Sequence, residues 1–302
     1  MKIGIASNIV LDTIKSADGS LTESVGGPPC YCGLTSKRFG FDIRLATRIG
    51  RDFPQEFRNQ LRDNDIILSD SQIVEAPTTR FTLTSESDGR ELVLSARCGQ
   101  LTTHEIRGMN VDCWLVSPVV DEVTPEVLGA IKRHRGKKDF IMLDPQGYMR
   151  KIAKDGRVVL EHHLDLDLSG MTAIKVDSQE MSALTGLQGV QGMQALQSRG
   201  IDFVVSTEHR IIHLLYKKIH YWINMRDVDT PDTTGAGDIL SASFVCAYLK
   251  ERDPLWAICF GGGAVRAALE TKKIGLAKIP SMSKIEQSAS YFYNTISFQQ
   301  LS

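Results

Sequence analysis

The stretch Asp232-Thr233-Thr234-Gly235-Ala236-Gly237-Asp238, followed by an apolar run over residues 239–249, decides what this chain is. Its two glycines let the backbone turn sharply and pass close to a ligand. The apolar run predicts a buried helix whose first N–H groups point back at the loop, and such a helix N-terminus attracts anions. A phosphate site beside the Asp238 carboxylate is what phosphoryl transfer to a hydroxyl needs. The alternative is an ordinary Asp-capped loop.

The full seven-residue string resembles the signature of the ribokinase (PfkB) family of carbohydrate and nucleoside kinases. The resemblance implies a three-layer αβα sandwich with a mainly parallel central sheet and a small β-sheet lid. It also implies ATP and Mg²⁺ as cofactors, with Thr233 in the nucleotide-binding loop. In that family, Asp238 would take the proton from the acceptor hydroxyl. N–H groups of Gly235, Ala236 and Gly237 would stabilise charge on the transferred group, and Gly235 and Gly237 would also contact the nucleotide.

Composition is that of an ordinary globular chain: 302 residues, 42% hydrophobic and 24% charged, with a net charge of −1. Basic and acidic residues are mixed, so we expect no nucleic-acid partner. No apolar run approaches the roughly 20 residues of a membrane-spanning helix. The start, Met1 to Ala6, predicts a first strand rather than a signal peptide. The six cysteines lack zinc-like spacing and suit a reducing compartment, so we expect a cytoplasmic protein with no membrane partner.

Short β-rich runs alternate with helical stretches, which predicts an α/β fold and a single domain over residues 1–302. We expect strands at residues 2–7, 43–47, 113–117, 140–144, 173–176 and 203–206. We expect helices at residues 30–39, 54–62, 125–134, 178–184 and 191–198, and then at about 238–251, 254–270 and 283–297.

Two insertions do not fit this alternation and lie at about residues 9–25 and 78–97. Each contains an Asp-Gly hairpin signal, at Asp18-Gly19 and at Asp88-Gly89. Both could be surface hairpins with no task. In the family a β-sheet lid emerges from the corresponding places, and a lid near an active site would exclude water. Lid sheets of the family often pair between subunits, so a homodimer through the lid is one expectation.

Substrate contacts are expected where the first strand ends and the first long helix begins. Gly26 and Gly27 precede Pro28-Pro29, a good helix start that also permits close approach of a ligand. By spacing alone, a plain helix start explains them. The resemblance assigns this glycine pair to the sugar, together with Asn8 and Asp12. Open α/β sheets bind ligands at the carboxyl ends of their strands, which agrees with that placement.

A second candidate for substrate binding is the segment from Asp144 to Arg150, which leaves another strand end. It resembles the Asp-Pro-Asn…Arg segment of sugar kinases, and its Gln146-x-x-Met-Arg form is similar to the myo-inositol kinase branch. Arg150 offers a donor fork for phosphate or substrate oxygens, or else a surface salt bridge. Arg97, just past the second lid strand, is expected either to reach the cleft or to be solvated.

Asp177-Ser178-Gln179-Glu180 follows a strand and opens a helix, so N-capping already explains its acidic residues. The family carries Asn-x-x-Glu here, and this motif orders magnesium, water and the phosphates. Asp177 replaces the Asn. Of the two residues, Glu180 is therefore the one that matches the family motif and is expected to serve Mg²⁺. The ion itself would be held mainly through phosphates and water.

The nucleotide and a monovalent cation are expected on the last third of the sheet. Ser206 ends the strand that lies by the nucleotide in the family. The run Gly261-Gly262-Gly263 starts or interrupts a late helix, which implies either tight helix packing or room for a flat ring. The family places adenine nearby, so Gly262 and Gly263 become candidates. Asp232 is expected to brace the loop or to bind a monovalent cation such as K⁺.

Together these features predict an ATP-dependent kinase of a small polyol, with myo-inositol or a related cyclitol as first choice. Ribose, fructose, 2-keto-3-deoxygluconate or a nucleoside such as adenosine is the alternative. The sparse aromatics near the lid, Phe81 and Tyr31, weigh against a stacked base. Two other classes stay open: a non-catalytic sugar-binding regulator and a structural module. The chain has no GxxxxGK[ST] motif, which excludes a P-loop kinase by motif.

Overall fold

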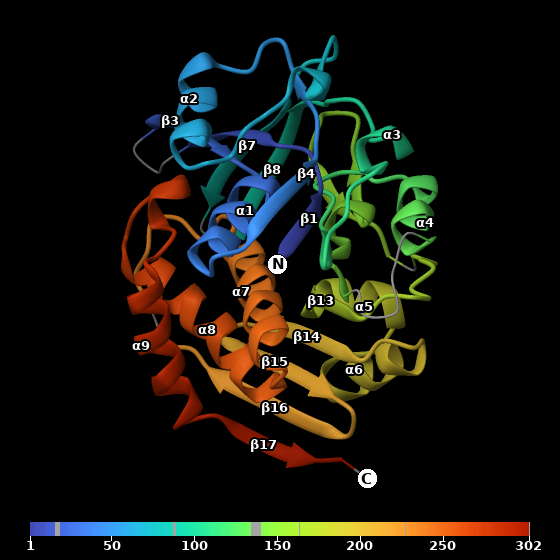
Figure 1. Cartoon of the computed structure of the whole chain (residues 1–302), viewed down its shortest axis with the longest axis vertical. Coiled ribbons are helices and arrows are strands. Elements are labelled where there is room, and N and C mark those ends of the chain that lie inside the picture. The colour runs from blue at the N-terminus through green and yellow to red at the C-terminus, as the bar shows by residue number, and fades with distance from the viewer. Residues whose placement is uncertain (16–18, 87–88, 134–139, 163, 227, 302) are drawn as a thin grey trace.

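The computed structural model describes residues 1–15, 19–86, 89–133, 140–162, 164–226 and 228–301 (Figure 1). Its central strands are β1 Lys2–Ala6, β4 Asp42–Ala46, β9 Cys113–Val116, β10 Phe140–Leu143, β13 Ala173–Asp177, β14 Phe203–Glu208, β15 Ile211–Tyr216, β16 Ile219–Asn224 and β17 Ser297–Gln300. They form one sheet in the order β17-β16-β15-β14-β13-β10-β9-β1-β4. Neighbours from β4 to β14 run parallel, and the last three strands are antiparallel to their neighbours.

Both faces of this sheet are covered, as the continuous apolar runs of its strands require. Along β10, Phe140 and Met142 join one apolar cluster, and Ile141 and Leu143 join another on the opposite face. Helices α1 Pro28–Arg38, α2 Gln55–Asp63, α7 Ala236–Glu251, α8 Pro254–Glu270 and α9 Met282–Tyr293 contribute to the first cluster. Helices α3 Thr103–Ile106, α4 Pro125–Arg133, α5 Ser178–Thr185 and α6 Gly189–Ser198 contribute to the second (Figure 1). The expected three-layer αβα sandwich is confirmed.

The two insertions form a single small sheet. Its strands are β2 Val10–Lys15, β3 Leu21–Gly26, β7 Thr79–Glu86 and β8 Gly89–Ala96, in the order β3-β2-β7-β8. Two hairpins are thus joined by parallel pairing of β2 with β7. The expected turn residues Asp18 and Asp88 lie outside the described residues. We call this four-stranded sheet the lid.

A further hairpin, absent from the sequence-based expectations, reaches up to the lid. It consists of β11 Arg150–Ile152 and β12 Val158–Leu160. The Leu94 N–H donates to the Gly156 carbonyl at 2.9 Å, and Val93 bridges to Arg157. Short elements complete the chain: β5 Ile49–Gly50, β6 Ile73–Val74, and the 3-10 turns η1 Asp70–Gln72, η2 Pro145–Tyr148 and η3 Gly275–Lys278.

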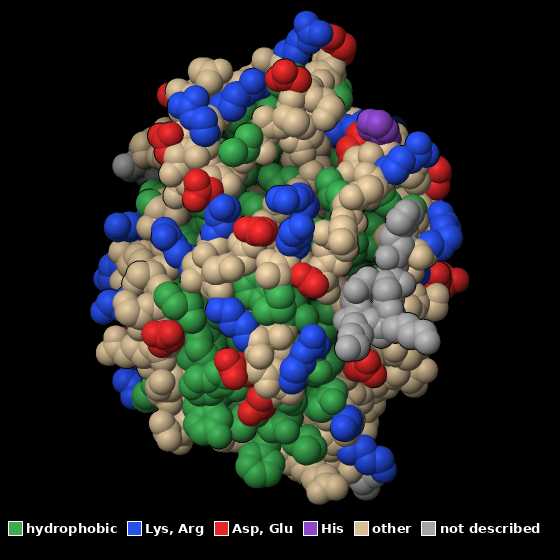
Figure 2. All heavy atoms as spheres, in the orientation of Figure 1, with side chains coloured by type: hydrophobic (Ala, Val, Ile, Leu, Met, Phe, Trp, Pro, Cys, Tyr) green, Lys and Arg blue, Asp and Glu red, His purple; other side chains and the backbone are tan. Residues whose placement is uncertain are grey.

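The expectation of a helix continuing to residue 297 was wrong. Helix α9 ends at Tyr293, and Ser297 pairs with Trp222 in the antiparallel ladder of β16 and β17. Pairing with a distant strand outweighs local helical preference here, since strand formation depends on neighbours in space. No helix among the described residues has the length and apolar character needed to cross a bilayer. On the face in Figure 2, basic and acidic side chains are interspersed.

The glycine run neither starts nor interrupts a helix, because it lies inside α8. A Cβ at Gly262 would stand 3.1 Å from Ile223 Cδ1, and one at Gly263 would stand 2.6 Å from the backbone nitrogen of Ala289. These glycines let α8 approach α9 and the sheet closely. Of the two alternatives, tight helix packing is the one that the contacts show.

We predict that Gly263→Ala lowers the free energy of unfolding by about 1–3 kcal/mol, the usual range for overpacking. The added methyl group would meet backbone of α9, which cannot move aside as a side chain can. Gly129→Ala in α4 is the matched control, since its nearest neighbour is the end of the flexible Arg133 side chain at 3.3 Å. That change should be neutral or stabilise by up to about 1 kcal/mol. Urea unfolding measures both, and equal effects would contradict the packing argument.

Candidate active site

A cavity of about 450 Å³ opens between the lid and the carboxyl ends of β10 and β13. Open α/β sheets bind their ligands at this edge. The lid contributes apolar side chains, and the strand ends and the start of α7 contribute polar ones. The lining residues that carry the argument below are Asp12, Gly27, Tyr31, Phe81, Asp144, Gln146, Arg150, Lys175, Asp177, Glu180 and the run Thr233 to Asp238.

The loop before α7 has the predicted shape. Gly235 is the N-cap of this helix and has φ +76°, which a side chain would strain. A Cβ there would also collide with the ring of Tyr31, so the loop lies flat on that buried ring. The Ala236 N–H donates to the Thr233 carbonyl at 3.2 Å. The first turn of α7 therefore begins at the cavity, with the positive end of its dipole toward it.

Asp238 lies in that first turn, 8% exposed, and lines the cavity. Burial, aided by the nearby Asp144 carboxylate, raises the pKa of Asp238 to about 7. Lys175, Arg150 and a hydrogen bond from Ser117 act in the opposite direction. A carboxylate with a pKa near neutrality is suited to take up a proton under ordinary conditions.

Lys175 is the main residue that the sequence reasoning missed. It lies in β13, 8% exposed, with its Nζ 3.1 Å from Asp144 Oδ2 and 4.0 Å from Glu180 Oε2. Burial alone would lower the pKa of Lys175, but these carboxylates outweigh it and the pKa is raised. A Cβ on Gly237 would be 3.1 Å from its Nζ, so the ammonium faces the start of α7. The signal was available: a single charge inside an apolar strand.

Asp177 and Glu180 form a capping box at the start of α5. The Glu180 N–H donates to Asp177 Oδ1 at 2.7 Å, and the Asp177 N–H donates to Glu180 Oε2 at 2.8 Å. Both residues also line the cavity. Burial raises the pKa of Glu180 to about 7, against the effect of Lys175. The capping interpretation therefore holds, and it leaves each carboxylate at the cavity wall.

The expected substrate residues near the lid are partly brought to the cavity. Asp12, on β2, is 6% exposed and lines it. Gly26 stands behind it: a Cβ at Gly26 would be 2.7 Å from Asp12 Oδ2. Gly27 lines the cavity with φ +83° and caps α1, and its Cβ would stand 3.0 Å from the Asn8 carbonyl. Gly26 thus gives room to the Asp12 carboxylate.

Gln146 and Arg150 reach the same cavity through one chain of hydrogen bonds. Arg150 Nη2 donates to Gln146 Oε1 at 2.9 Å, and Gln146 Nε2 donates to Ser117 Oγ at 3.3 Å. The other arm of the guanidinium, Nη1, donates to the Val119 carbonyl at 2.6 Å. Because Ser117 in turn donates a hydrogen bond to Asp238, the chain of hydrogen bonds runs from the β11–β12 hairpin to that carboxylate.

Comparison with known proteins now identifies the fold and family. The family model of the pfkB family carbohydrate kinases matches residues 2–280. The chain belongs to this family. A cytidine kinase of Thermococcus kodakarensis is 23% identical to this kinase over 280 residues, which are 90% of this chain and 96% of that protein.

Solved structures agree with the family in fold. One is a pyrophosphate-dependent kinase of the ribokinase family, complexed with a pyrophosphate analogue and myo-inositol. It has a TM-score of 0.80 at 19% identity, covering 95% of this chain and 100% of its own. A fructokinase double mutant from Vibrio cholerae O395, with fructose, ADP and potassium bound, has a TM-score of 0.75 at 17% identity, covering 96% and 98%. The kinase is therefore a phosphotransferase of the carbohydrate and nucleoside class with a ribokinase-like fold.

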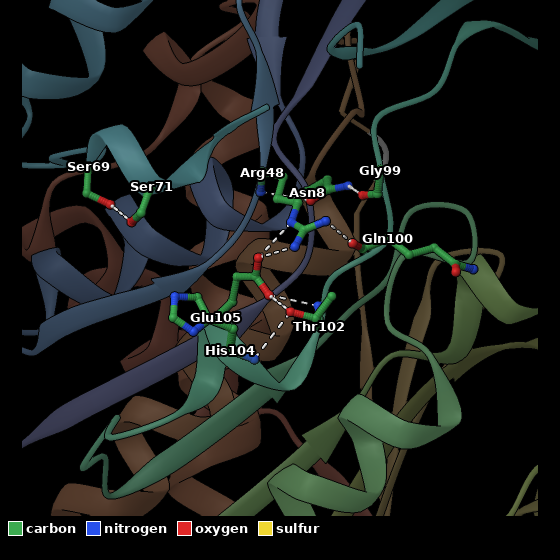
Figure 3. A network of polar contacts seen from close by, with 9 residues as sticks. All are labelled: Asn8, Arg48, Ser69, Ser71, Gly99, Gln100, Thr102, His104 and Glu105. Atoms are coloured by element: carbon green, nitrogen blue, oxygen red, sulfur yellow. Dashed lines mark hydrogen bonds and ion pairs between the residues drawn. The ribbon is translucent and has the colours of Figure 1, made fainter. Parts of the chain in front are cut away.

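Besides Gly26, several of the expected ligand-binding residues are absent from the described lining of the cavity. Asn8 is 1% exposed, and its Nδ2 donates to the Gly99 carbonyl at 3.0 Å while its Oδ1 accepts the Arg48 N–H at 2.9 Å (Figure 3). Its amide thus ties three segments together. The others are Ser206, buried in β14, and Gly262 and Gly263, packed within α8.

Arg97 is likewise outside the described lining of the cavity, where it forms an exposed ion pair with Asp121. Contact of these residues with a ligand stays a prediction.

Asp232 does not present its carboxylate to the cavity. Its Oδ1 accepts the Thr234 N–H at 2.8 Å, and its Oδ2 accepts the Gly275 N–H at 2.9 Å and lies 2.6 Å from Lys278 Nζ. Burial works against ionisation, but these bonds outweigh it and lower the pKa of Asp232. Of the two expected roles, bracing the loop is the one that the contacts show.

We predict that Lys175→Met lowers the free energy of unfolding by about 3–5 kcal/mol, because it leaves buried carboxylates without a counter-charge. Adding Asp144→Asn should recover part of the loss, since it removes the carboxylate that pairs with Lys175 at 3.1 Å. Denaturant unfolding of the two single variants and the double variant measures the coupling. Strictly additive losses would contradict a direct pair.

Proposed function

We propose that this kinase transfers the terminal phosphoryl group of ATP to a hydroxyl of a small polyol, with Asp238 as general base. The observation that carries the proposal is the meeting of two features in one cavity. The buried Asp238 carboxylate stands at the N-terminus of α7, and Asp12, Gln146 and Arg150 line the same cavity. One group accepts a proton, the helix end attracts an anion, and the others suit hydroxyl groups.

The transfer then follows from the positions of these groups. Asp238 takes the proton of the attacking hydroxyl as its oxygen forms a bond to the terminal phosphorus, and the bond from that phosphorus to the bridging oxygen breaks, so that ADP leaves with the electron pair. The N–H groups of Gly235, Ala236 and Gly237 at the start of α7 receive the oxygens of the transferred group. The Ala236 N–H already donates within the loop at 3.2 Å, so we give most weight to the two glycines. The Lys175 ammonium, facing Gly237, adds positive charge where negative charge accumulates.

Magnesium fits the acidic wall of the cavity. Glu180 and Asp177 each engage one oxygen in the capping box, and both line the cavity. Mg²⁺ usually keeps several waters and binds one or two carboxylates together with substrate phosphates. Glu180 would hold it through water, and the ion would neutralise phosphate charge when bound.

For the acceptor we favour myo-inositol or a related cyclitol. The support is the Gln146–Arg150 pair in the cavity and the fold shared with a kinase whose structure contains myo-inositol. The Arg150 guanidinium lies 5.7 Å from the centroid of the Phe81 ring, which uses one face of the aromatic side chain that would stack a base. The alternatives are ribose, fructose, 2-keto-3-deoxygluconate and nucleosides, cytidine and adenosine among them.

Pyrophosphate is a second candidate donor. Ser206, expected beside the nucleotide, and Gly262 and Gly263, expected near the adenine, are packed in the interior of the described structure. The residues expected to bind the phosphates, Gly235, Ala236 and Gly237, by contrast line the cavity. A pyrophosphate-dependent kinase shares this fold. The site thus supports recognition of the phosphates more directly than recognition of a base.

A coupled enzyme assay, run over a panel of compounds, identifies both the phosphoryl donor and the acceptor. ATP and pyrophosphate, each with Mg²⁺, would be tested against inositols, pentoses, hexoses, keto-acids and nucleosides. Donor consumption that depends on an added polyol supports the proposal. Nucleotide or sugar binding without turnover would identify a non-catalytic regulator, and no binding at all a structural module. Light scattering would test the proposed homodimer through the lid, and fractionation the proposed cytoplasmic location.

We predict that Asp238→Asn retains the fold and donor affinity but lowers turnover by about 10²–10⁴-fold, the usual contribution of a general base. The amide keeps the size of the side chain and cannot accept the proton. Asp121→Asn is the control, because that carboxylate pairs with Arg97 outside the cavity lining. Single-turnover kinetics and a thermal shift with donor measure both effects. Wild-type turnover in Asp238→Asn would remove this residue from the mechanism.

The pH dependence should report the same carboxylate. Because only the ionised form accepts a proton, kcat/KM should rise with pH and level off above about 7, the pKa of Asp238. Glu180 has a similar pKa, so Glu180→Gln is needed as a control. In this variant the activity should fall, but the rise of kcat/KM with pH should remain. A rate independent of pH below neutrality, or the loss of this rise in Glu180→Gln, would contradict the assignment to Asp238.

A further inference from the structure

Lys278, at the end of η3, is a lysine with no exposed surface, and its ammonium lies under the loop that precedes α7. Its Nζ donates to the carbonyl oxygens of Asp232 and Thr234, each at 2.9 Å. The same Nζ lies 2.6 Å from Asp232 Oδ2. One carboxylate and two carbonyl oxygens thus converge on one positive charge, and an ammonium group carries three donors.

These three oxygens resemble the shell of a bound alkali cation rather than that of a surface ion pair. Carbonyl and carboxylate oxygens are the ligands of hard cations, and two of them here are backbone atoms whose dipoles are fixed by the loop. The ring of Tyr31 closes the site, with its centroid 5.9 Å from Nζ. Ammonium and potassium ions carry the same charge and are similar in size, so either would fit such a shell.

The expected monovalent cation therefore does not fit this chain. Asp232 uses Oδ1 for the Thr234 N–H and Oδ2 for Lys278 and the Gly275 N–H. A second cation beside the ammonium would meet like charge in a buried place, which is strongly unfavourable. The charge of Asp232 is already balanced by a group belonging to the chain.

We propose that the Lys278 ammonium is a built-in monovalent cation that holds the Asp232–Gly235 loop in place, so that this kinase works without K⁺. The link to activity rests on the proposed function, in which this loop leads to the N–H groups that bind the phosphoryl group. The tether replaces binding from solution, because the ammonium is always at a high effective concentration beside its oxygens. A free ion would leave the site at low salt, and Lys278 does not.

The first test uses the wild-type kinase in K⁺, Na⁺, Cs⁺ and tetramethylammonium chloride at constant ionic strength. Both the Tm of the free protein and the turnover are measured. We expect each to be the same in all four salts. A K⁺-specific rise in Tm or turnover would overturn the proposal. The Tm needs no substrate, so a failure of the proposed function would leave this reading intact.

The second test uses Lys278→Ser, which removes the ammonium and leaves its three oxygen partners in place. We expect a lower Tm that K⁺ raises and tetramethylammonium does not, with turnover following the same order. Lys284→Ser, an exposed lysine on α9, is the control and should respond to no salt. A variant equally stable in K⁺ and tetramethylammonium would overturn the proposal. If Lys278→Ser does not fold in any of the salts tested, the measurements on the wild-type kinase decide alone.

Discussion

Buried carboxylates gather at one end of the sheet, and two buried ammonium groups offset the repulsion between them. Lys175 stands between Asp144 and Glu180, and Lys278 binds Asp232 from beneath the neighbouring loop. Buried carboxylates without counter-charges would be costly, so the arrangement depends on both cations. The start of α7 lies between them, with Lys175 facing Gly237 and Lys278 holding the Thr234 carbonyl.

The same charges set the chemistry of Asp238. Burial and Asp144 favour its protonated form, and Lys175 and Arg150 favour its ionised form, with the result that the pKa is near 7. A phosphate donor would bring more negative charge into a cavity already lined by Asp12, Asp144, Glu180 and Asp238. Lys175 and the helix dipole oppose that repulsion only in part, which is why a divalent ion suits this site.

The sequence predicted what local patterns encode. The glycine loop, the parallel strands and the strand pairs β2–β3 and β7–β8 each carry a short signal, and these features are present among the described residues. The carboxylates at strand ends were found in the same way. Contacts that depend on folding were not found. Lys278 meets Asp232 across 46 positions of the chain, and nothing local marks either as a partner. The amide of Asn8, expected at the substrate, bonds Gly99 and Arg48, and its contact with substrate stays a prediction.

Lys175 is an intermediate case, because it lay in a predicted strand and its charge among apolar neighbours was a local sign of burial. The Gly261–Gly263 run left packing and a ligand as alternatives in the sequence, and the position of α9 in the structure is what shows the packing. Strand β17 could not be predicted from local sequence, since its extended structure depends on pairing with β16, which is distant in sequence.

The hairpin of β11 and β12 joins the lid to the floor of the cavity. Its tip is fastened to β8 by the Leu94–Gly156 hydrogen bond, and its first residue is Arg150. The hairpin therefore contacts the lid at its tip and carries the Arg150 guanidinium of the candidate site at its base. A displacement of the lid would therefore act through this hairpin on Arg150 and on its hydrogen bond with Gln146.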